Sequence, residues 1–295
     1  MKIESFPRKL FLFRNNLCMF AQTQNELHNM KHMSILAVSL LALVACTPEK
    51  KQEADYSQYV NPMIGTDFTG NTYPGAQVPF GMVQLSPDNG LPGWDRISGY
   101  FYPDTTIAGF SHTHLSGTGA GDLYDISFMP VTRPYKEAPA PLGIYSTFSH
   151  NDEAASAGYY RVLLKDYNIN VELTATERCG IQRYTFPEAE ASVFLNLKKA
   201  MNWDFTLDSK IEVVDSTTIR GYRLSQGWSP LQHVYFETRF SKPFVACHMD
   251  TTSIVTKEKG WIGTAYVARF DFNTKKDEEI LVTTGISGVS INRDT

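Results

Sequence analysis

The residues whose side chains are best suited to binding or catalysis lie in one glycine-rich stretch, from Gly93 to Asp125. Each glycine that is fixed in a fold costs conformational entropy and brings no side chain to bury. This composition is therefore typical of a loop that shapes a site. The candidates for chemistry in the stretch are Trp94, Asp95, His112, His114, Asp122 and Asp125.

Trp94 lies between Pro92-Gly93 and Asp95-Arg96, a loop context in which a large ring is more often exposed than in a strand. An exposed indole packs well against the apolar C–H face of a pyranose, so Trp94 is a candidate sugar platform. The competing interpretation is a lid folded back on the core. Asp95 would lie within reach of sugar hydroxyls, although an aspartate after a turn is more often a cap or turn residue.

His112 and His114 form an H-x-H pair, and an extended strand would place both rings on one face. Two imidazoles could bind zinc, but zinc needs a third protein ligand, for which Asp122 is the nearest candidate. The other interpretations are hydrogen bonds that shape the loop or contact a ligand, and exposure to solvent. The pattern favours the hydrogen-bonding role, and we assign no metal to these residues.

The charge and the glycine pattern both argue against phosphate-bearing partners. The SGTGAGD segment, residues 116–122, lacks the strand-to-helix context of a phosphate-binding loop, and Asp122 and Asp125 would repel an anion. The whole chain carries a net charge of −4. Residues 1–45 hold five Lys and Arg but two Asp and Glu, so the remainder has a net charge of −7. Such a charge disfavours nucleic acid.

The amino-terminal segment reads as a signal for export. Lys31 and His32 precede an apolar run from Ile35 to Ala45, which is too short to span a bilayer. The run ends in Leu43-Val44-Ala45-Cys46, which is similar to a bacterial lipobox, and lipidation of Cys46 would anchor the protein to a membrane, in the periplasm or at the cell surface. An ordinary signal peptide with a coincidental cysteine is the alternative. The residues before Met30 are consistent with a start codon assigned too early.

Three segments follow from this organisation. Residues 1–45 form the signal segment, residues 46–58 a polar tether without periodicity, and residues 59–295 one large domain. With Cys46 lipidated, Cys179 and Cys247 are either free or paired with each other.

The second half of the chain predicts strand after strand. β-Branched and aromatic residues alternate with polar ones, and short polar breaks separate the runs. The expected strands are 159–166, 169–177, 180–186, 192–197, 218–225, 233–240, 261–272 and 279–287. Since no helix-period pattern of a dozen residues follows Cys46, we expect an all-β, antiparallel β-sandwich.

The order of motifs closely resembles the amino-terminal domain of glycoside hydrolase family 92. The resemblance rests on YVNPMIGTDFTGNTYPGAQVPFGMVQLSPD from Tyr59, on GWD from Gly93 and on GFSHTHLSGTGAGD from Gly109 to Asp122. It implies a lectin-like sandwich from a calcium-dependent, inverting exo-α-mannosidase that degrades mannose-containing glycans. It also implies that the loop with Trp94 faces the pocket for the terminal mannose, with Asp95, His112, His114 and Asp122 as further substrate-binding candidates.

The resemblance places the catalytic machinery elsewhere. An inverting glycosidase needs two carboxyl groups roughly 6.5–9.5 Å apart, one as acid and one as base. In the family, these groups and the calcium ligands belong to an (α/α)6 barrel downstream of the sandwich, which also supplies most outer-pocket contacts. We therefore expect no catalytic residue and no calcium ligand in this chain, whose sequence stops near the end of the sandwich.

Three interpretations of function remain open. The first is the sugar-facing part of a mannosidase that lacks its catalytic barrel and is inactive alone. The second is a stand-alone lipoprotein that binds glycans without catalysis. The third is a structural surface lipoprotein whose Trp94 and histidines serve packing. The family resemblance favours the first.

Overall fold

The computed structural model describes residues 55–140, 142–198, 204–256 and 261–291. These residues belong to a compact unit, Asp55–Thr295. The expected signal segment, residues 1–45, the lipidation site Cys46 and the tether up to Ala54 lie outside the described residues. Among the described residues, no helix is long and apolar enough to cross a membrane.

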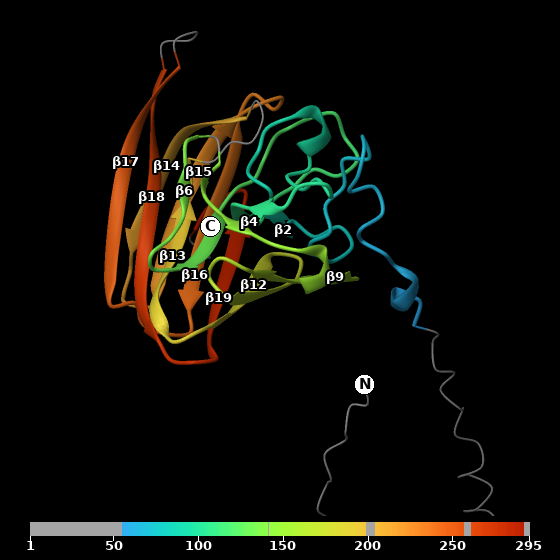
Figure 1. Ribbon diagram of the computed structural model, residues 1–295. Helices are drawn as coiled ribbons and strands as arrows, with labels where there is room; N and C mark the ends of the chain where they lie inside the picture. Colours follow the sequence, from blue (N-terminus) through green and yellow to red (C-terminus); the bar gives the residue numbers. More distant parts are fainter. Residues whose placement is uncertain (1–54, 141, 199–203, 257–260, 292–295) are drawn as a thin grey trace, which may run out of the picture. The chain divides into compact units, whose positions relative to one another are not determined.

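Two large antiparallel sheets form the domain (Figure 1). The seven-stranded sheet has the order β1 (Ala76–Gln77), β2 (Gln84–Asp88), β4 (Gly109–Ser111), β5 (Ser127–Thr132), β13 (Ala189–Asn196), β18 (Trp261–Thr274) and β17 (Ala246–Thr256). The eight-stranded sheet has the order β14 (Phe205–Val213), β15 (Thr218–Gln226), β16 (Gln232–Phe240), β19 (Glu278–Ser287), β12 (Cys179–Phe186), β11 (Ile169–Ala175), β10 (Tyr159–Leu164) and β9 (Glu153–Ser156).

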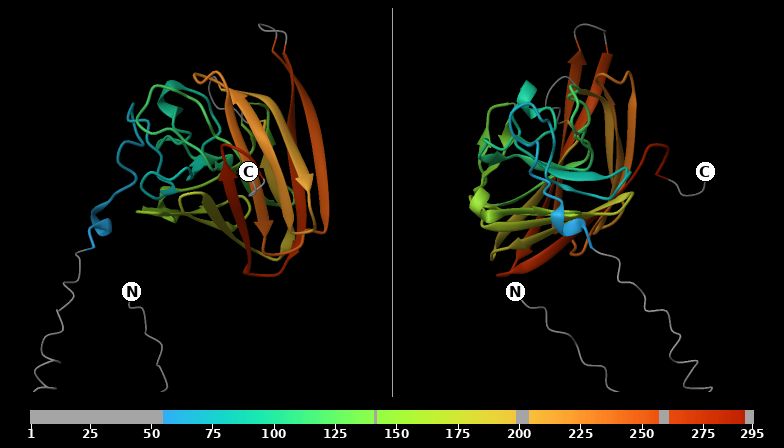
Figure 2. Two further views of the ribbon diagram at one scale, coloured as in Figure 1. Left: turned by 180° about the vertical axis from the view of Figure 1, so that it is seen from behind. Right: turned by 90° about the vertical axis from the view of Figure 1, so that its right-hand side faces the viewer.

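Short elements complete the domain within the loops. Two strand pairs stand apart from the main sheets: β3 (Thr106–Ile107) with β8 (Ser146–Thr147), and β6 (Glu137–Ala138) with β7 (Gly143–Ile144). Single 3-10 turns form at η1 (Ser57–Tyr59), η2 (Trp94–Arg96) and η3 (His150–Asp152). The loop-rich part, coloured blue to green, lies beside the long strands in all three views (Figures 1 and 2).

The all-β sandwich predicted from the sequence is confirmed. Each of the eight expected strands forms, because alternate side chains point into the core, as the burial of β12 shows residue by residue. Inside, the buried rings of Phe128, Phe270 and Phe272 surround Phe240 with centroid distances of 5.2–6.5 Å. These rings come from both sheets, so they join the two layers into one core.

Two long strands were not predicted. The sequence of β14, FTLDSKIEV, places Thr206 and Ser209 on its buried side, so apolar and polar residues do not alternate along it. β17 reads ACHMDTTSIVT and pairs with β18 at the edge of the seven-stranded sheet. The two cysteines left open by the sequence are free: Cys179 lies on β12 and Cys247 on β17, in different sheets.

Candidate functional site

The segment from Leu123 to Ile126 adopts backbone dihedral angles that residues with side chains rarely adopt. Leu123, Tyr124 and Ile126 have φ values of 86°, 65° and 54°, in the left-handed region. Such conformations cost on the order of 1–3 kcal/mol each in a residue with a side chain, and they persist only where the surroundings impose them. The strained segment immediately follows the glycine-rich residues 117–121 and precedes β5.

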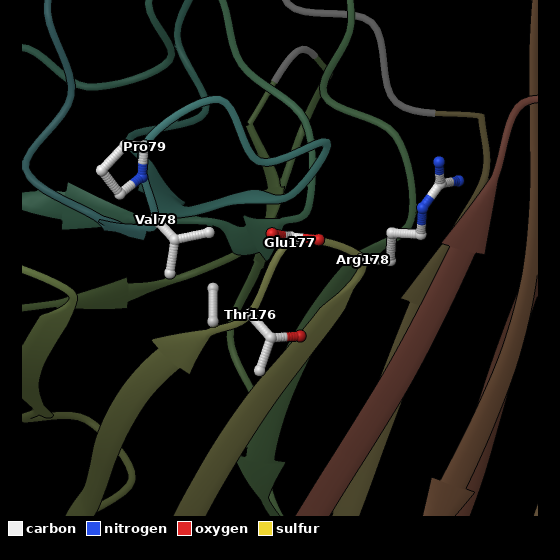
Figure 3. Close-up of a pocket in the computed structure, with 6 residues that line it drawn as sticks. Val78, Pro79, Thr176, Glu177 and Arg178 are labelled. Carbon is white, nitrogen blue, oxygen red and sulfur yellow. The ribbon is translucent and has the colours of Figure 1, made fainter.

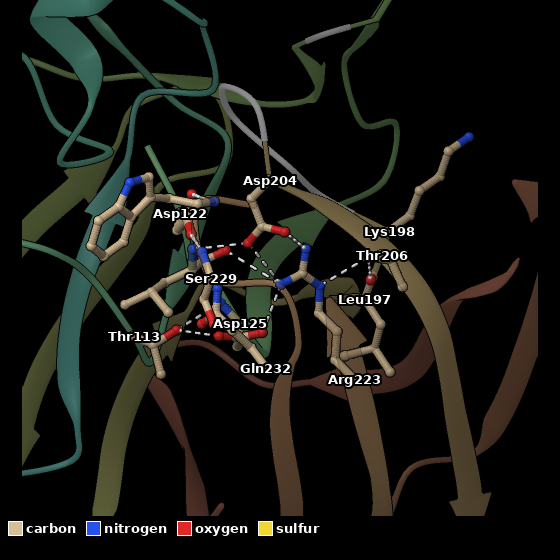
Figure 4. Close-up of polar contacts among 12 residues, drawn as sticks. Thr113, Asp122, Asp125, Leu197, Lys198, Asp204, Thr206, Arg223, Ser229 and Gln232 are labelled. Carbon is tan, nitrogen blue, oxygen red and sulfur yellow. Dashed lines mark hydrogen bonds and ion pairs between the residues drawn. The ribbon is translucent and has the colours of Figure 1, made fainter. Parts of the chain in front are cut away.

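A buried ion cluster holds this segment in place (Figure 4). Arg223 on β15 donates from Nη1 to Oδ1 of Asp125 at 2.7 Å, and its guanidinium lies 3.3 Å from the carboxylate of Asp204. The same carboxylate accepts the backbone N–H of Leu123 at 2.8 Å. Asp125 also accepts the hydroxyl of Thr113 at 2.7 Å. The inner face of the eight-stranded sheet thus fixes the loop that carries the candidate residues.

Burial dominates the protonation of Asp204 in this cluster. Arg223 is 1% exposed and both aspartates are equally inaccessible. Burial raises the pKa of Asp204 to about 6, although the nearby Arg223 opposes the shift. Asp125 adds to it, because a second negative charge also disfavours ionisation of Asp204.

Asp122 anchors a turn and does not face open solvent. Its carboxylate is 3% exposed and accepts the backbone N–H groups of Trp228 at 3.0 Å and Ser229 at 3.1 Å. The side-chain amide of Gln232 lies 3.3 Å from the same carboxylate. These contacts join the glycine-rich loop to the connection between β15 and β16. Trp228, in that connection, is 84% exposed.

Trp94 is exposed, as its loop context predicts. It begins the 3-10 turn η2, and 59% of its surface is accessible, so it is not a lid on the core. A Cβ added to Gly119 would lie 3.2 Å from Cη2 of Trp94, so the indole edge rests on the glycine-rich loop. Asp95 follows it in η2 and is half-buried.

His112 and His114 are buried, which excludes the interpretation that they are solvated. The strand β4 ends at Ser111, just before the pair. His114 Nε2 lies 2.9 Å from Oδ1 of Asp88, and its Nδ1 lies 2.7 Å from the carbonyl oxygen of Gln84. The Nδ1 atom of His112 lies 2.7 Å from the carbonyl oxygen of Ile126. Both rings therefore shape the loop through hydrogen bonds.

Burial also controls the charge of His112. Its ring is fully inaccessible, and desolvation lowers its pKa to about 4, although the hydrogen bond to Ile126 opposes the shift. Its Nε2 has no hydrogen-bond partner in the part of the chain that the structure describes. Gly180 on β12 packs against this edge of the ring, where an added Cβ would come within 2.8 Å of Nε2.

The structure brings most of the predicted residues together in three loops that contact one another, residues 93–96, 112–126 and 227–231, which we call the loop system. The loop system and its supports also include residues that were not predicted from the sequence. Arg223, Asp204, Asp88 and Trp228 were not predicted. Of these, only Trp228 carried a usable signal, since it lies between Gly227 and Ser229-Pro230 in a turn-like sequence. An arginine inside a strand pattern gives no sign that it faces inward.

A hollow of about 540 Å³ lies between the loop after β1 and the β11–β12 turn, lined by Val78, Pro79, Ala175, Thr176, Glu177 and Arg178 (Figure 3). It includes none of the predicted site residues. Within the described ranges, no group of three or more His, Cys, Asp or Glu side chains is placed to hold a metal ion. The calcium site that the resemblance implies belongs to the downstream barrel, so this finding does not test it.

Comparison with known proteins decides the family. The model of the glycosyl hydrolase family 92 N-terminal domain matches residues 59–287. The chain belongs to glycoside hydrolase family 92. Among curated proteins, an uncharacterized secreted glycosidase of Arthroderma benhamiae is 26% identical over 172 residues, which is 55% of this chain and 21% of that protein.

Solved structures of family 92 enzymes share the fold. A family GH92 α-mannosidase from Bacteroides thetaiotaomicron is 39% identical with a TM-score of 0.72, over 79% of this chain and 33% of that one. Its complex with mannoimidazole gives 38% identity and a TM-score of 0.70. A family GH92 inverting mannosidase from the same species is 26% identical with a TM-score of 0.64, over 81% of this chain and 32% of that one. The family 92 chain described here thus spans about a third of these solved relatives.

We predict that Arg223→Met destabilises the domain by about 3–5 kcal/mol, because it leaves Asp125 and Asp204 buried without their cation. The free energy of unfolding in urea measures this. Arg220→Met is the matched control, since Arg220 lies on the same strand but pairs with Glu212 at the surface. Equal, small effects of the two substitutions would contradict the role given to Arg223.

We also predict that His112 makes the domain sensitive to acid. Because the pKa of His112 is lowered from 6.5 to about 4 in the fold, its neutral form stabilises the fold fully above pH 6.5, and this contribution is lost as the pH falls from 6.5 to about 4. Between pH 7 and 4.5, His112→Leu should therefore lose about 2–3 kcal/mol less than the unmodified chain. His233→Leu is the control for removal of a histidine side chain at an exposed position. An equal loss of unfolding free energy between pH 7 and 4.5 in the unmodified chain and both variants would contradict the role given to His112.

Proposed function

We propose that this domain is the sugar-facing amino-terminal part of an exported exo-α-mannosidase, which cleaves α-mannosides by inverting hydrolysis. The observation that carries the proposal is Trp94, a 59% exposed indole seated on the glycine-rich loop of a family 92 domain. An exposed aromatic face complements the apolar face of a pyranose. Support also comes from the solved relatives, which are named as α-mannosidases and as an inverting mannosidase.

The carboxylates of the loop system support a binding role over a catalytic one. Asp122 accepts two backbone N–H groups, and Asp125 and Asp204 share Arg223. A general acid or base must reach the substrate, whereas these groups are buried and already engaged. Asp95 is the half-buried carboxylate next to Trp94, and we propose that it binds a sugar hydroxyl. His112, His114 and Asp122 act on the sugar indirectly, by shaping the loop.

The setting of the protein is also a proposal. We infer that residues 1–45 direct export and that Cys46 carries a lipid anchor, which places the domain at a membrane surface, where it meets mannose-containing glycans. The curated relative is named as a secreted glycosidase, which supports export. Calcium and the catalytic acid and base would belong to an (α/α)6 domain that acts together with this one.

Sugar binding by Trp94 predicts a fluorescence change. Titration of the purified chain with methyl α-mannoside should perturb the tryptophan emission, because stacking removes water from the exposed indole. Trp94→Ala should abolish the change. A flat titration up to millimolar sugar would instead favour the structural-lipoprotein interpretation.

A second prediction concerns catalysis. The purified chain, with calcium present, should release no mannose from an α-linked mannobiose, because the buried carboxylates of its site are committed to the fold. Chromatography of the free sugar measures this. Turnover at an enzyme-like rate would overturn the assignment of a binding role. Binding without turnover is also what the alternative predicts, a stand-alone carbohydrate-binding lipoprotein.

A further inference from the structure

We propose that Trp228 forms a second sugar-stacking surface, which contacts the sugar next to the mannose held at Trp94. This inference rests on the proposed function of the Trp94 site. Trp228 would then be a specificity-determining residue of the amino-terminal domain, which distinguishes longer α-mannosides from a single mannose.

The first step is the exposure of the ring. Trp228 lies in the connection between β15, which ends at Gln226, and β16, which begins at Gln232. It is 84% exposed and is the second most exposed large hydrophobic side chain in the part of the chain that the structure describes, after Phe80 at 106%. An indole at a turn adds nothing to the core of this sandwich. Its position therefore calls for an explanation outside the fold.

The second step is that the turn is held rigidly. Asp122 accepts the backbone N–H groups of Trp228 and Ser229, so both oxygens of a buried carboxylate are used to fix this one turn. A Cβ added to Gly227 would lie 2.3 Å from Oδ1 of Asp122, so only glycine permits this approach. Burial of a carboxylate is costly, and two strands can be joined by a shorter turn without it. The arrangement fixes the backbone that carries the exposed ring before any ligand arrives.

The third step links the two tryptophans. The edge of Trp94 rests on Gly119, and Asp122, three residues further on, holds the backbone of Trp228. Three residues of extended chain span at most about 11 Å, so one short loop contacts both the ring of Trp94 and the backbone of Trp228. Arg223 and Asp204 hold the end of that loop, since they bind the backbone of the strained residue Leu123 and Arg223 also pairs with Asp125.

The exposed face of the ring fits a sugar. Ser229 and Gln232 follow Trp228 in the chain and are half-buried, and the backbone N–H of Ser229 and the side-chain amide of Gln232 both donate to the carboxylate of Asp122. These groups hold the turn, and they leave the indole face open to the apolar C–H face of a pyranose. An α-linked oligosaccharide that places its terminal mannose on Trp94 would extend its next sugar over the same loop.

The test compares a monosaccharide with a disaccharide. Calorimetric titration of the purified chain uses methyl α-mannoside and an α-linked mannobiose as probes. We expect Trp228→Ala to weaken mannobiose binding about three- to tenfold and to leave methyl α-mannoside binding unchanged. Trp94→Ala should weaken both. Trp228→Phe keeps an aromatic face and should retain most of the mannobiose affinity, and Phe80→Ala is the control for removal of an exposed ring elsewhere.

The outcomes separate the two proposals. If Trp94→Ala weakens both sugars and Trp228→Ala weakens neither, the second stacking surface is wrong while the function proposed for Trp94 stands. Equal weakening of both sugars by Trp228→Ala also overturns the inference, since the ring would then belong to the mannose site. If the unmodified chain binds neither sugar, the proposed function fails and this inference fails with it. Because Trp228 is exposed, Trp228→Ala should unfold at the same temperature as the unmodified chain.

Discussion

The buried guanidinium of Arg223 is the constraint on which the site depends. It lies between carboxylates from two distant parts of the chain, Asp125 before β5 and Asp204 before β14. Such an ion cluster adds little to stability by itself, because burying charges costs about as much as their attraction returns. Its effect is positional: Arg223 and Asp204 bind both backbone polar groups of Leu123, which keeps a strained segment in a single conformation. That segment directly follows Asp122, whose carboxylate holds the backbone of Trp228 and Ser229.

The sequence was sufficient for the architecture because strand burial has a local signature. β12 and β19 alternate buried and accessible residues along most of their length, and this period of two is visible in the letters themselves. β14 was not predicted because its buried side includes the polar residues Thr206 and Ser209. Thr206 accepts a hydrogen bond from Nε of Arg223, whereas Ser209 accepts the backbone N–H of Tyr266. At Thr206 the departure from the strand pattern thus marks the place where the sheet holds the buried arginine.

The site was only partly predictable, because its key contacts join residues about 100 positions apart. The exposure of Trp94 follows from its immediate neighbours, Pro92-Gly93 and Asp95. The anchoring of Trp228 by Asp122 spans 106 positions, and the pairing of Arg223 with Asp125 spans 98. No local pattern encodes such a pairing. The sequence alone therefore does not show that the carboxylate of Asp122 binds the turn at Trp228.

The contributions of His112 and Asp204 to the stability of the fold change in opposite directions as the pH changes. Burial lowers the pKa of His112, so its contribution to stability is lost as pH falls through about 4. Burial raises the pKa of Asp204 to about 6, so its contribution is present at pH values below 3.8 and is lost as pH rises through 6. Between these limits the two contributions change in opposite directions as the pH falls. The loop that both groups support, through Ile126 and Leu123, therefore contains one group that weakens the fold in acid and one that opposes this effect, and the acid sensitivity predicted for the domain is the part that belongs to His112.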